Sequence, residues 1–500
     1  MEEKLKTKIF NMLRELKENN KVECKLSENK FPKEALETYS SFANTDGGII
    51  VLGVEEKRGK FNISGIQNLD KIKKEIFNIL NNKEKVSKNL ITDKDIIEET
   101  IEEKNIIIIK VPRASYKDKP IFIGTNPMTG TYKRNFDGDY KCSQDEIKAM
   151  IRDSSEELMD NILLEGFSIE DLDEHTLNDY RNRFATLKPN HPFISMNNEE
   201  FFKKIGVLRK NRNSGKLEPT MAGILVFGKI EAIKEVLPHF FIEYVDKSDI
   251  SEDRWKDRVI YDGTWGEGNI YNFFFLVINK LYSSTNKNFE LEGDGITRKE
   301  VNSVQIALRE AFVNSIIHSD FKIEEPIKIT RYKDYYEFKN PGSLRISKDD
   351  FFRGEHSKPR NSIINDIFKH INLCEQAGSG IPKILSAVKK EKFKYPEIKD
   401  ENMSFSLKFW NIGNISNYEK ASEEGKIILQ YLLKEKKITN REAREKFNYS
   451  KKKVILLFDD LIEEGYIEKK GAGRGTYYRL KMTEDEEKIE KILKERLGND

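Results

Sequence analysis

Apolar residues in this sequence occur in short runs, and this feature limits the folds open to the chain. The densest runs are Ile106–Ile109 and Phe273–Ile278. Both are far shorter than the roughly 18 residues that a membrane-spanning helix needs. The run Ile49–Val54 follows the turn signal Asn44–Gly48 and has the continuous apolar character of a buried strand. We therefore expect several separate cores built from strands and helices, and no membrane partner.

Composition indicates a folded chain of more than one domain. Its 500 residues correspond to about three domains. Charged residues make up 34% of the chain, but 30 Phe and 19 Tyr are too many for a disordered protein. The net charge of +2 shows no global basic excess, so a nucleic-acid site must be a local patch. Three cysteines and an N-terminus without a signal peptide lead us to expect a cytoplasmic protein.

Periodicity and turn signals divide the chain into five regions of an α/β multidomain protein. In order, these are a first α/β domain (1–153), a linker and middle region (154–290), a second α/β domain (291–413), a small helical module ending in a hairpin (420–481) and a charged helix (482–500). In the middle region we expect a linker helix at 154–165 and a strand at Ala222–Gly228.

One helical segment of the second α/β domain carries a polar stripe on an otherwise mostly apolar surface. Glu310, Asn314 and His318 recur every fourth residue in the expected helix Asn302–His318 and form a narrow stripe. A buried polar stripe is costly unless its groups are hydrogen-bonded or bind a ligand. The spacing alone does not distinguish two explanations. The stripe could be a set of hydrogen-bonded buried side chains that pack against a sheet, or it could be a ligand site.

Three loops that follow this helix favour a ligand. Asn340-Pro341-Gly342 ends a strand, Ser357–Asn361 is a polar loop with two cations, and Gly378-Ser379-Gly380 enters a helix. Backbone amides of a glycine loop at a helix N-terminus bind anions. A carboxylate and an amide one turn apart can position water and Mg²⁺ at a phosphate.

In these motifs the segment resembles the ATP-binding domain of the GHKL superfamily, and more closely the divergent branch found in bacterial RecG-like helicase-related regulators. The matching elements are Glu-x-x-x-Asn-x-x-x-His, Asn-Pro-Gly-Ser-Leu, Ser-Lys-Pro-Arg-Asn and Gly-Ser-Gly-Ile. The resemblance implies an α/β sandwich that binds ATP with Mg²⁺, in which Glu310 activates water and Asn314 holds the metal ion. The nucleotide-binding residues that it implies are Asn314, His318, Asn340, Gly342, Gly378 and Gly380.

The sequence departs from this superfamily at one position and lacks a helicase motif. Asn340 stands where the superfamily has an adenine-reading Asp, and a neutral amide lacks the charge-assisted strength of a carboxylate. We therefore expect nucleotide binding with slow or absent hydrolysis. A helicase function is not supported, because the sequence contains no Gly-x-x-x-x-Gly-Lys-Ser/Thr loop.

The first domain resembles the AlbA-like domain shared with Schlafen proteins. The matching segments, within residues 15–150, are Val22–Lys25, Ser41–Gly48, Gly53–Glu56, Lys119–Phe122 and Tyr132–Arg134. The resemblance implies a nucleic-acid-binding module, and in some members an RNA-cutting site with three acidic residues.

Three glutamates are candidates for such a metal site. Glu18 and Glu23 are five residues apart, as the first two acids are in those members, and Glu55 follows the apolar strand. Carboxylates can hold Mg²⁺ or Mn²⁺ to activate water on a phosphodiester, and Lys25 could stabilise the departing charge. Glu56 is the fallback for Glu55, because alternation along a strand turns one of the two toward the site. The simpler alternative is that Lys25 only pairs with Glu23.

The region 420–481 has the pattern of a winged helix-turn-helix. Thr439 is the N-cap candidate of its second helix, and Ser450–Leu461 is the expected recognition helix. The region has an excess of six positive charges, whereas the whole chain has +2. The candidate nucleic-acid contacts are Lys451, Lys452 and Lys453 on this helix and Lys469, Lys470 and Arg474 on the wing. The alternative is a winged helix used for protein contacts or dimerisation.

Together these features predict a cytoplasmic regulator of transcription that binds nucleic acid, with DNA or RNA as its partner. One of its domains is expected to bind a nucleotide. The main alternative is a Schlafen-like metal-dependent endonuclease of RNA or tRNA that serves phage defence. A third hypothesis is an ATPase module of a larger assembly. Homo-oligomerisation is a further expectation.

Overall fold

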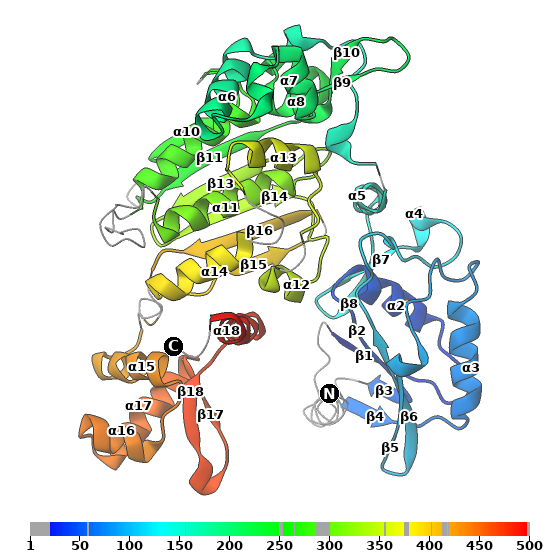
Figure 1. The fold of residues 1–500 in the computed structure, drawn as a ribbon. Helices are drawn as coiled ribbons and strands as arrows, with labels where there is room; N and C mark the ends of the chain where they lie inside the picture. Colours follow the sequence, from blue (N-terminus) through cyan, green and yellow to red (C-terminus); the bar gives the residue numbers. More distant parts are fainter. Residues whose placement is uncertain are drawn as a thin grey trace. The chain divides into compact units, whose positions relative to one another are not determined.

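The computed structural model forms two compact units (Figure 1). Both contain helices and strands, so the chain is a mixed α/β protein, as the sequence predicts. Unit 1 contains residues 1–158 with the short segments Gly342–Ser347 and Glu401–Met403, and unit 2 contains the rest. The residues that the structure describes are 21–57, 60–155, 157–249, 254–264, 266–285, 301–354, 357–374, 380–401, 403–412, 418 and 420–497. Within these ranges, no helix has both the length and the apolar character needed to cross a bilayer.

A four-stranded sheet with the order β1-β2-β6-β5 forms the centre of unit 1. Its strands are β1 (Val22–Lys25), β2 (Gly48–Leu52), β5 (Ile96–Ile101) and β6 (Lys104–Val111). The pair β1–β2 is parallel and the other pairs are antiparallel. Alternation along the strands gives each face its own core: Ile107 and Ile109 pack against the helices, and Ile106 and Ile108 face the other side.

Helices and two hairpins complete unit 1. The helices are α2 (Glu34–Asn44), α3 (Leu69–Leu80), α4 (Pro127–Gly130) and α5 (Gln144–Ser154), with a 3₁₀ turn η1 at Asp93–Asp95. The hairpins are β3 (Val54–Lys57) with β4 (Lys60–Ile63), and β7 (Tyr132–Asn135) with β8 (Gly138–Lys141). Apolar residues at helical spacing predict a helix over residues 1–20, and this segment lies outside the described residues.

Unit 2 begins with a mainly helical region in which two predictions are wrong. Its helices are α6 (Glu174–Leu187), α7 (Asn198–Lys204), α8 (Met221–Phe227) and α9 (Ile230–Val236), with a hairpin of β9 (Leu208–Lys210) and β10 (Leu217–Pro219). The apolar run predicted as a strand is helix α8, whose N-cap Thr220 accepts from the backbone N–H of Gly223. A short, fully apolar run fits a buried helix as well as a strand. The predicted linker helix is reduced to the 3₁₀ turn η2 (Met159–Asn161).

A six-stranded sheet with the order β12-β11-β13-β14-β16-β15 forms the main body of unit 2. The strands are β11 (Ile242–Lys247), β12 (Asp257–Ile260), β13 (Ile327–Tyr332), β14 (Tyr335–Pro341), β15 (Glu397–Asp400) and β16 (Ser404–Trp410). The pair β11–β13 is parallel and the others are antiparallel. The predicted boundary at residue 291 therefore divides a single sheet, because β11 and β12 come before it.

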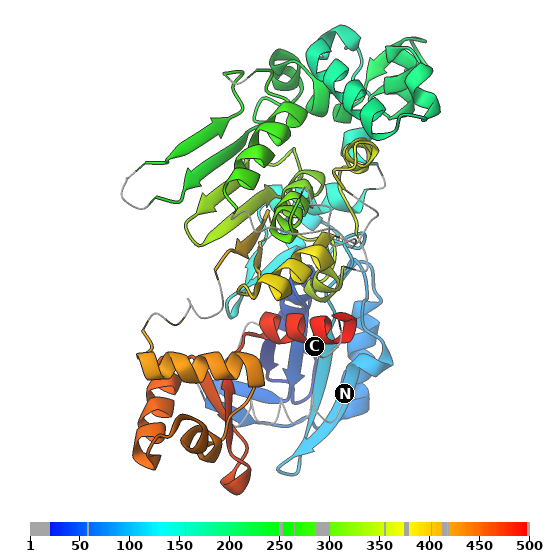
Figure 2. The ribbon, with the colours of Figure 1, turned by 60° about the vertical axis from the view of Figure 1, so that its left-hand side comes forward.

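Helices cover one face of this sheet, as Figures 1 and 2 show. They are α10 (Ile270–Ser283), α11 (Ser303–Ile317), α13 (Ser362–His370) and α14 (Gly380–Glu391), and the shorter α12 (Lys348–Arg353) lies near α14. A capping box of Asn302 and Gln305 starts α11, which matches the predicted helix Asn302–His318. The ring of Phe274 stacks on Phe312 with centroids 4.8 Å apart, which joins α10 to α11 in the core.

A small module with its own core follows. It consists of α15 (Glu423–Glu435), α16 (Asn440–Phe447), α17 (Lys451–Glu463) and a hairpin of β17 (Ile467–Lys470) and β18 (Tyr477–Leu480), with a 3₁₀ turn η6 (Gly473–Gly475). Thr439 caps α16 in a capping box with Glu442, as predicted. The assignment as a winged helix stays a prediction. The charged helix is α18 (Glu484–Leu497), and Lys488 on it pairs with Asp349 of α12 at 2.8 Å.

Candidate functional sites

Glu23, a predicted metal ligand, is buried and bound to two cations. Nζ of Lys25 lies 2.6 Å from Oε1 of Glu23, and Nη2 of Arg134 lies 2.8 Å from Oε2. Burial alone would lower the pKa of Arg134, but hydrogen bonds and charge from Asp139 and Glu23 outweigh it and keep that pKa above its usual value. The simpler alternative, in which Lys25 pairs with Glu23, is the observed arrangement, and both oxygens of the carboxylate are in use.

The same network ties helix α2 to the β7–β8 hairpin. Asp139 accepts from Nη1 of Arg134 at 2.9 Å and from Oγ1 of Thr38 at 2.6 Å, and Oγ of Ser41 also donates to it. Asn44 is buried, donates to the backbone oxygen of Ile121 at 2.8 Å and accepts from the N–H of the same residue at 2.8 Å. The segment Ser41–Gly48, which includes Ala43 and Asn44, therefore joins helix α2 to Ile121 and to the β7–β8 hairpin within unit 1.

The other acidic candidates do not join Glu23 in a metal site within the described residues. Glu18 lies outside them. Glu55 on β3 is half-buried with Oε1 3.6 Å from Nζ of Lys57, and Glu56 is exposed. Across the described part of the chain, no group of three or more His, Cys, Asp or Glu side chains is placed to hold a metal ion. The three-glutamate site stays a prediction.

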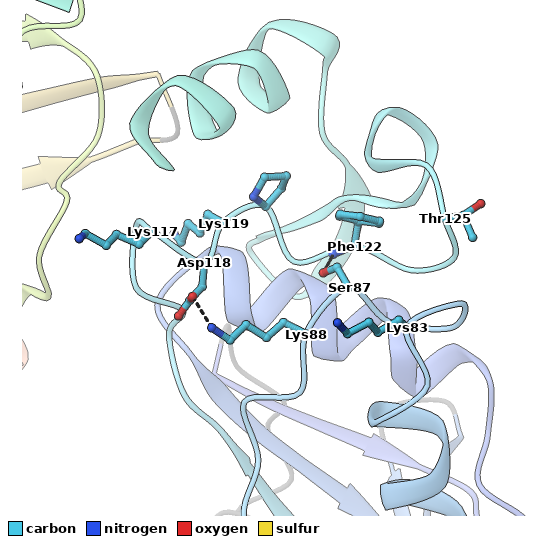
Figure 3. A pocket seen from close by; sticks show the side chains of 9 residues that line it. Lys83, Ser87, Lys88, Lys117, Asp118, Lys119, Phe122 and Thr125 are labelled. Carbon is cyan, nitrogen blue, oxygen red and sulfur yellow. Dashed lines mark hydrogen bonds and ion pairs between the residues drawn. The ribbon is translucent and has the colours of Figure 1, made fainter. Parts of the chain in front are cut away.

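A pocket lined by lysines lies between two loops of unit 1 (Figure 3). It has a volume of about 560 Å³, and its lining consists of Lys83, Ser87, Lys88, Lys117, Asp118, Lys119, Pro120, Phe122 and Thr125. Backbone bonds fix the two loops to each other: the N–H of Ser87 donates to the oxygen of Phe122 at 2.9 Å, and that of Gly124 donates to the oxygen of Lys85 at 2.8 Å. The pocket is therefore formed by two loops that backbone hydrogen bonds fix to each other.

Four cations and one anion give the pocket a positive charge. Lys88 pairs with Asp118 at 2.5 Å, and Nζ of Lys119 donates to the backbone oxygen of Asn44. Lys83 and Lys117 are exposed and have no ion-pair partner among the described residues. Sequence reasoning missed this site, although the clusters at 83–88 and 117–119 are dense in lysine. Their closeness depends on the fold, because about 30 residues separate them.

In unit 2 the start of helix α14 lies directly over the polar stripe of α11. Glu310 is buried, and Nζ of Lys383 on α14 donates to its Oε1 at 3.0 Å. A Cβ added at Gly380 would lie 3.0 Å from Oε2 of Glu310 and 3.1 Å from Nδ2 of Asn314. The predicted water-activating residue Glu310 and the predicted nucleotide-binding residue Asn314 thus meet the glycine that begins α14. Gly378 lies outside the described residues.

The remaining predicted nucleotide-binding residues occupy separate positions. His318 is the C-cap residue of α11, and its backbone oxygen accepts from Nη1 of Arg360 at 2.8 Å. Asn340 is buried at the end of β14 and donates to the backbone oxygen of Pro341 at 3.1 Å. Gly342 has a φ of +93°, a backbone conformation that favours glycine.

The polar loop after α12 completes the C-terminal end of α11. Asn361 is buried, and its Nδ2 donates to the backbone oxygen of Ser319 at 2.9 Å and to that of Ile316 at 3.2 Å. The last carbonyls of a helix have no partner within the helix. Asn361, like Arg360, therefore has a structural role that its position in a polar motif did not reveal.

The candidate nucleic-acid-binding lysines of the C-terminal module differ in exposure and in ion pairing. Lys451 and Lys452 are exposed without an ion-pair partner in the described part of the chain. Lys453 pairs with Glu424 at 2.8 Å and lies over the ring of Tyr449. Of the wing residues, Lys469 is exposed and Lys470 pairs with Glu468 at 2.9 Å. The side chain of Arg474 is outside the description.

Comparisons with known proteins identify three segments. Residues 18–143 match the family "Schlafen, AlbA_2", residues 148–243 match a "Domain of unknown function (DUF8451)", and residues 324–409 match "Putative ATP-dependent DNA helicase recG C-terminal". No curated protein matches the chain.

Two solved structures are similar in part. One is the DIP2311 protein from Corynebacterium diphtheriae, with 17% identity, 99% of each chain covered and a TM-score of 0.41. The other is the N-terminal domain of a putative ATP-dependent DNA helicase RecG-related protein from Nitrosomonas europaea, with 24% identity and a TM-score of 0.21 over 26% of this chain and 91% of that one.

Proposed function

We propose that this chain is a nucleic-acid-binding regulator of transcription and that its second domain binds a nucleotide. The proposal starts from the Schlafen AlbA_2 domain at its N-terminus and the RecG C-terminal domain further on. The observation that carries the proposal is the lysine pocket of unit 1. Its cations suit the phosphates of a nucleic-acid backbone, which dominate the affinity of such complexes. The half-buried ring of Phe122 beside them gives a base a surface for stacking.

A double charge reversal tests this site. We expect Lys83→Glu with Lys117→Glu to weaken binding of short single-stranded RNA or DNA by about tenfold or more, and to lower the salt dependence by about one unit of slope per lost phosphate contact. The matched control is Lys71→Glu with Lys74→Glu, which makes the same charge change on exposed positions of α3. Equal losses in both variants would refute a specific pocket.

Additional measurements separate the competing sites and activities. If Lys451→Ala with Lys452→Ala removes binding of duplex DNA while the pocket variant retains it, the nucleic-acid site belongs to the C-terminal module. Incubation of the wild-type chain with tRNA and Mg²⁺ or Mn²⁺ tests the endonuclease alternative. Cleavage that EDTA abolishes would favour that alternative over binding alone.

We also propose that unit 2 binds ATP or ADP with Mg²⁺ at the junction of α11 and α14. Asn314 would hold the metal ion, Glu310 would position water, and Lys383 adds a cation 3.0 Å from Glu310. An amide, a carboxylate and the N-terminus of α14 meet at Gly380, and groups of these kinds bind phosphates and divalent ions. The neutral Asn340 favours binding without brisk hydrolysis.

Thermal unfolding checks the nucleotide proposal. Nucleotide at about 100 times its dissociation constant should stabilise the folded state by roughly 2.7 kcal/mol. Asn314→Ala should abolish this stabilisation, and Asn279→Ala, an exposed position on α10, should retain it. A melting temperature indifferent to millimolar nucleotide would reject the proposal. Brisk ATP turnover that is lost in Glu310→Gln would reject the expectation of slow hydrolysis.

A further inference from the structure

The exposed face of helix α17 has a regular order of charge. At its N-terminal end are Lys451 and Lys452, in the middle are Ile455 and Leu456, and toward its C-terminal end are Asp459 and Asp460. Ile455 is 42% exposed and Leu456 is 54% exposed, although both are large apolar residues. Removing these two apolar side chains from water would favour association with another molecule.

The fold of the module fixes which face of α17 is exposed. Val454, Leu457, Phe458 and Leu461 are buried in the core of the module and set the rotation of the helix. The two lysines and two aspartates have no ion-pair partner among the described residues. These four charged side chains are therefore available to pair with charges of another molecule.

The charges are arranged symmetrically about one point. The midpoint between Ile455 and Leu456 is equally far from Lys452 and Asp459 along the helix, and also from Lys451 and Asp460. We propose that α17 docks antiparallel against α17 of a second copy of this chain, around a two-fold axis at this midpoint. Lys452 of each copy then faces Asp459 of the other, and Lys451 faces Asp460. In such an isologous contact every favourable pair occurs twice.

The apolar centre and the helix direction support the same arrangement. Ile455 and Leu456 of both copies lie at the axis and lose their exposure to water there. The positive N-terminal end of each helix dipole lies beside the negative C-terminal end of the other. A single helix pair buries little area, so we expect a weak dimer with a dissociation constant in the micromolar range.

A second copy fits this face better than nucleic acid does. Beyond the first turn the exposed residues are apolar or acidic, and Asp459 and Asp460 would repel a phosphate backbone. The inference goes beyond the proposed function, which places nucleic acid on unit 1 and the nucleotide in unit 2 at α11.

Charge exchange in the full-length chain tests the dimer. Sedimentation velocity over a range of protein concentrations should show a monomer–dimer equilibrium that weakens as salt is added. Lys452→Asp alone and Asp459→Lys alone should each raise the dissociation constant by about tenfold or more, because each places like charges opposite one another twice. The double variant restores opposite charges in exchanged positions and should return to within about threefold of the wild type.

The outcomes that overturn the proposal are specific. A wild-type chain that stays monomeric at all concentrations, or a dimer indifferent to either single reversal, would reject it. Failure of the double variant to restore association would also reject it, since melting temperatures can show that the variant is folded. The matched control is Lys469→Asp, an exposed charge reversal on β17 of the same module. It should leave the dissociation constant unchanged.

Discussion

Single side chains in this protein stabilise ends of elements that lie far away in the sequence. Asn361 follows α11 by more than 40 positions, yet it satisfies carbonyls at the end of that helix. The sequence placed it correctly in a polar loop but could not reveal its partners, because loop-to-helix contacts depend on the tertiary fold. The same is true of Arg134, whose pairing with Glu23 decides how that carboxylate is used.

Asn361→Ala should lower the free energy of unfolding by about 1–3 kcal/mol, since it removes the side-chain donor to the backbone oxygens of Ile316 and Ser319 at the buried end of α11. Asn361→Asp should cost more, because a carboxylate cannot donate and repels the carbonyl oxygens. Urea unfolding of the full-length variants measures both. Asn213→Ala, in an exposed turn, serves as the control. Equal midpoints for all four proteins would contradict the structural role of Asn361.

Glu23→Gln should destabilise unit 1 by about 1–3 kcal/mol, because Arg134 would keep its charge in a buried position with one carboxylate fewer. Chelation by EDTA should not change the stability of the wild type if Glu23 holds cationic side chains alone. Glu56→Gln, on an exposed position, is the control. A Mn²⁺-dependent rise in melting temperature that disappears in Glu23→Gln would return this residue to a metal site.

At the scale of elements, helix α13 begins with a carboxylate supplied by a distant turn. Oδ2 of Asp160 accepts from the N–H groups of Ile363 and Ile364 at 2.6 and 3.1 Å, while Oδ1 is buried without a hydrogen-bond partner in the described structure. The pKa of Asp160 is raised to about 6, chiefly by burial, against the effect of the backbone hydrogen bonds.

Stability should therefore fall as the pH rises through this pKa. The folded state holds the proton of Asp160 more tightly than the unfolded state, so its advantage is complete below about pH 4 and is lost as the pH rises through about 6. Asp160→Asn removes this titration. The free energy of unfolding of the variant relative to the wild type should rise by about 1–3 kcal/mol between about pH 4.5 and 7.5. A difference independent of pH would show that Asp160 does not titrate in this range.

Elements with clear terminal signals were predictable, and apolar runs without such signals were not. The capping residues Asn302 and Thr439 start helices where the sequence predicts them. The run that forms α8 carries no period, because every side chain of the helix is buried. In that environment neither a polar face nor alternation distinguishes a helix from a strand.

At the scale of the whole molecule, the sequence indicated mixed α/β units but not which strands share a sheet. Patterning predicts that a strand exists, but pairing depends on the path of the chain. β11 lies parallel to β13, and a crossover of about 80 residues that includes α10 connects them. The lysine pocket was missed for the same reason, since two loops meet only in the folded unit.

The shared sheet makes a prediction about fragments. A fragment of residues 291–413 lacks β11, β12 and α10, so β13 becomes an exposed edge and the core around Phe312 loses Phe274. We expect this fragment to aggregate or to show no cooperative unfolding, whereas residues 159–500 should unfold cooperatively. Circular dichroism during heating compares the two. A cooperative transition in the shorter fragment would mean that the sheet does not need its first two strands.

The parallel pairing of β11 also has a consequence for synthesis on the ribosome. The last central strand of the sheet, β16, is translated about 160 residues after β11, which corresponds to roughly 10–30 s at ordinary elongation rates. For the first half of that interval, until β13 is made, β11 and β12 can form only a hairpin, with one edge of β11 unpaired. The nascent chain therefore passes through a stage at which chaperones and neighbouring nascent chains compete with its own later residues for that edge.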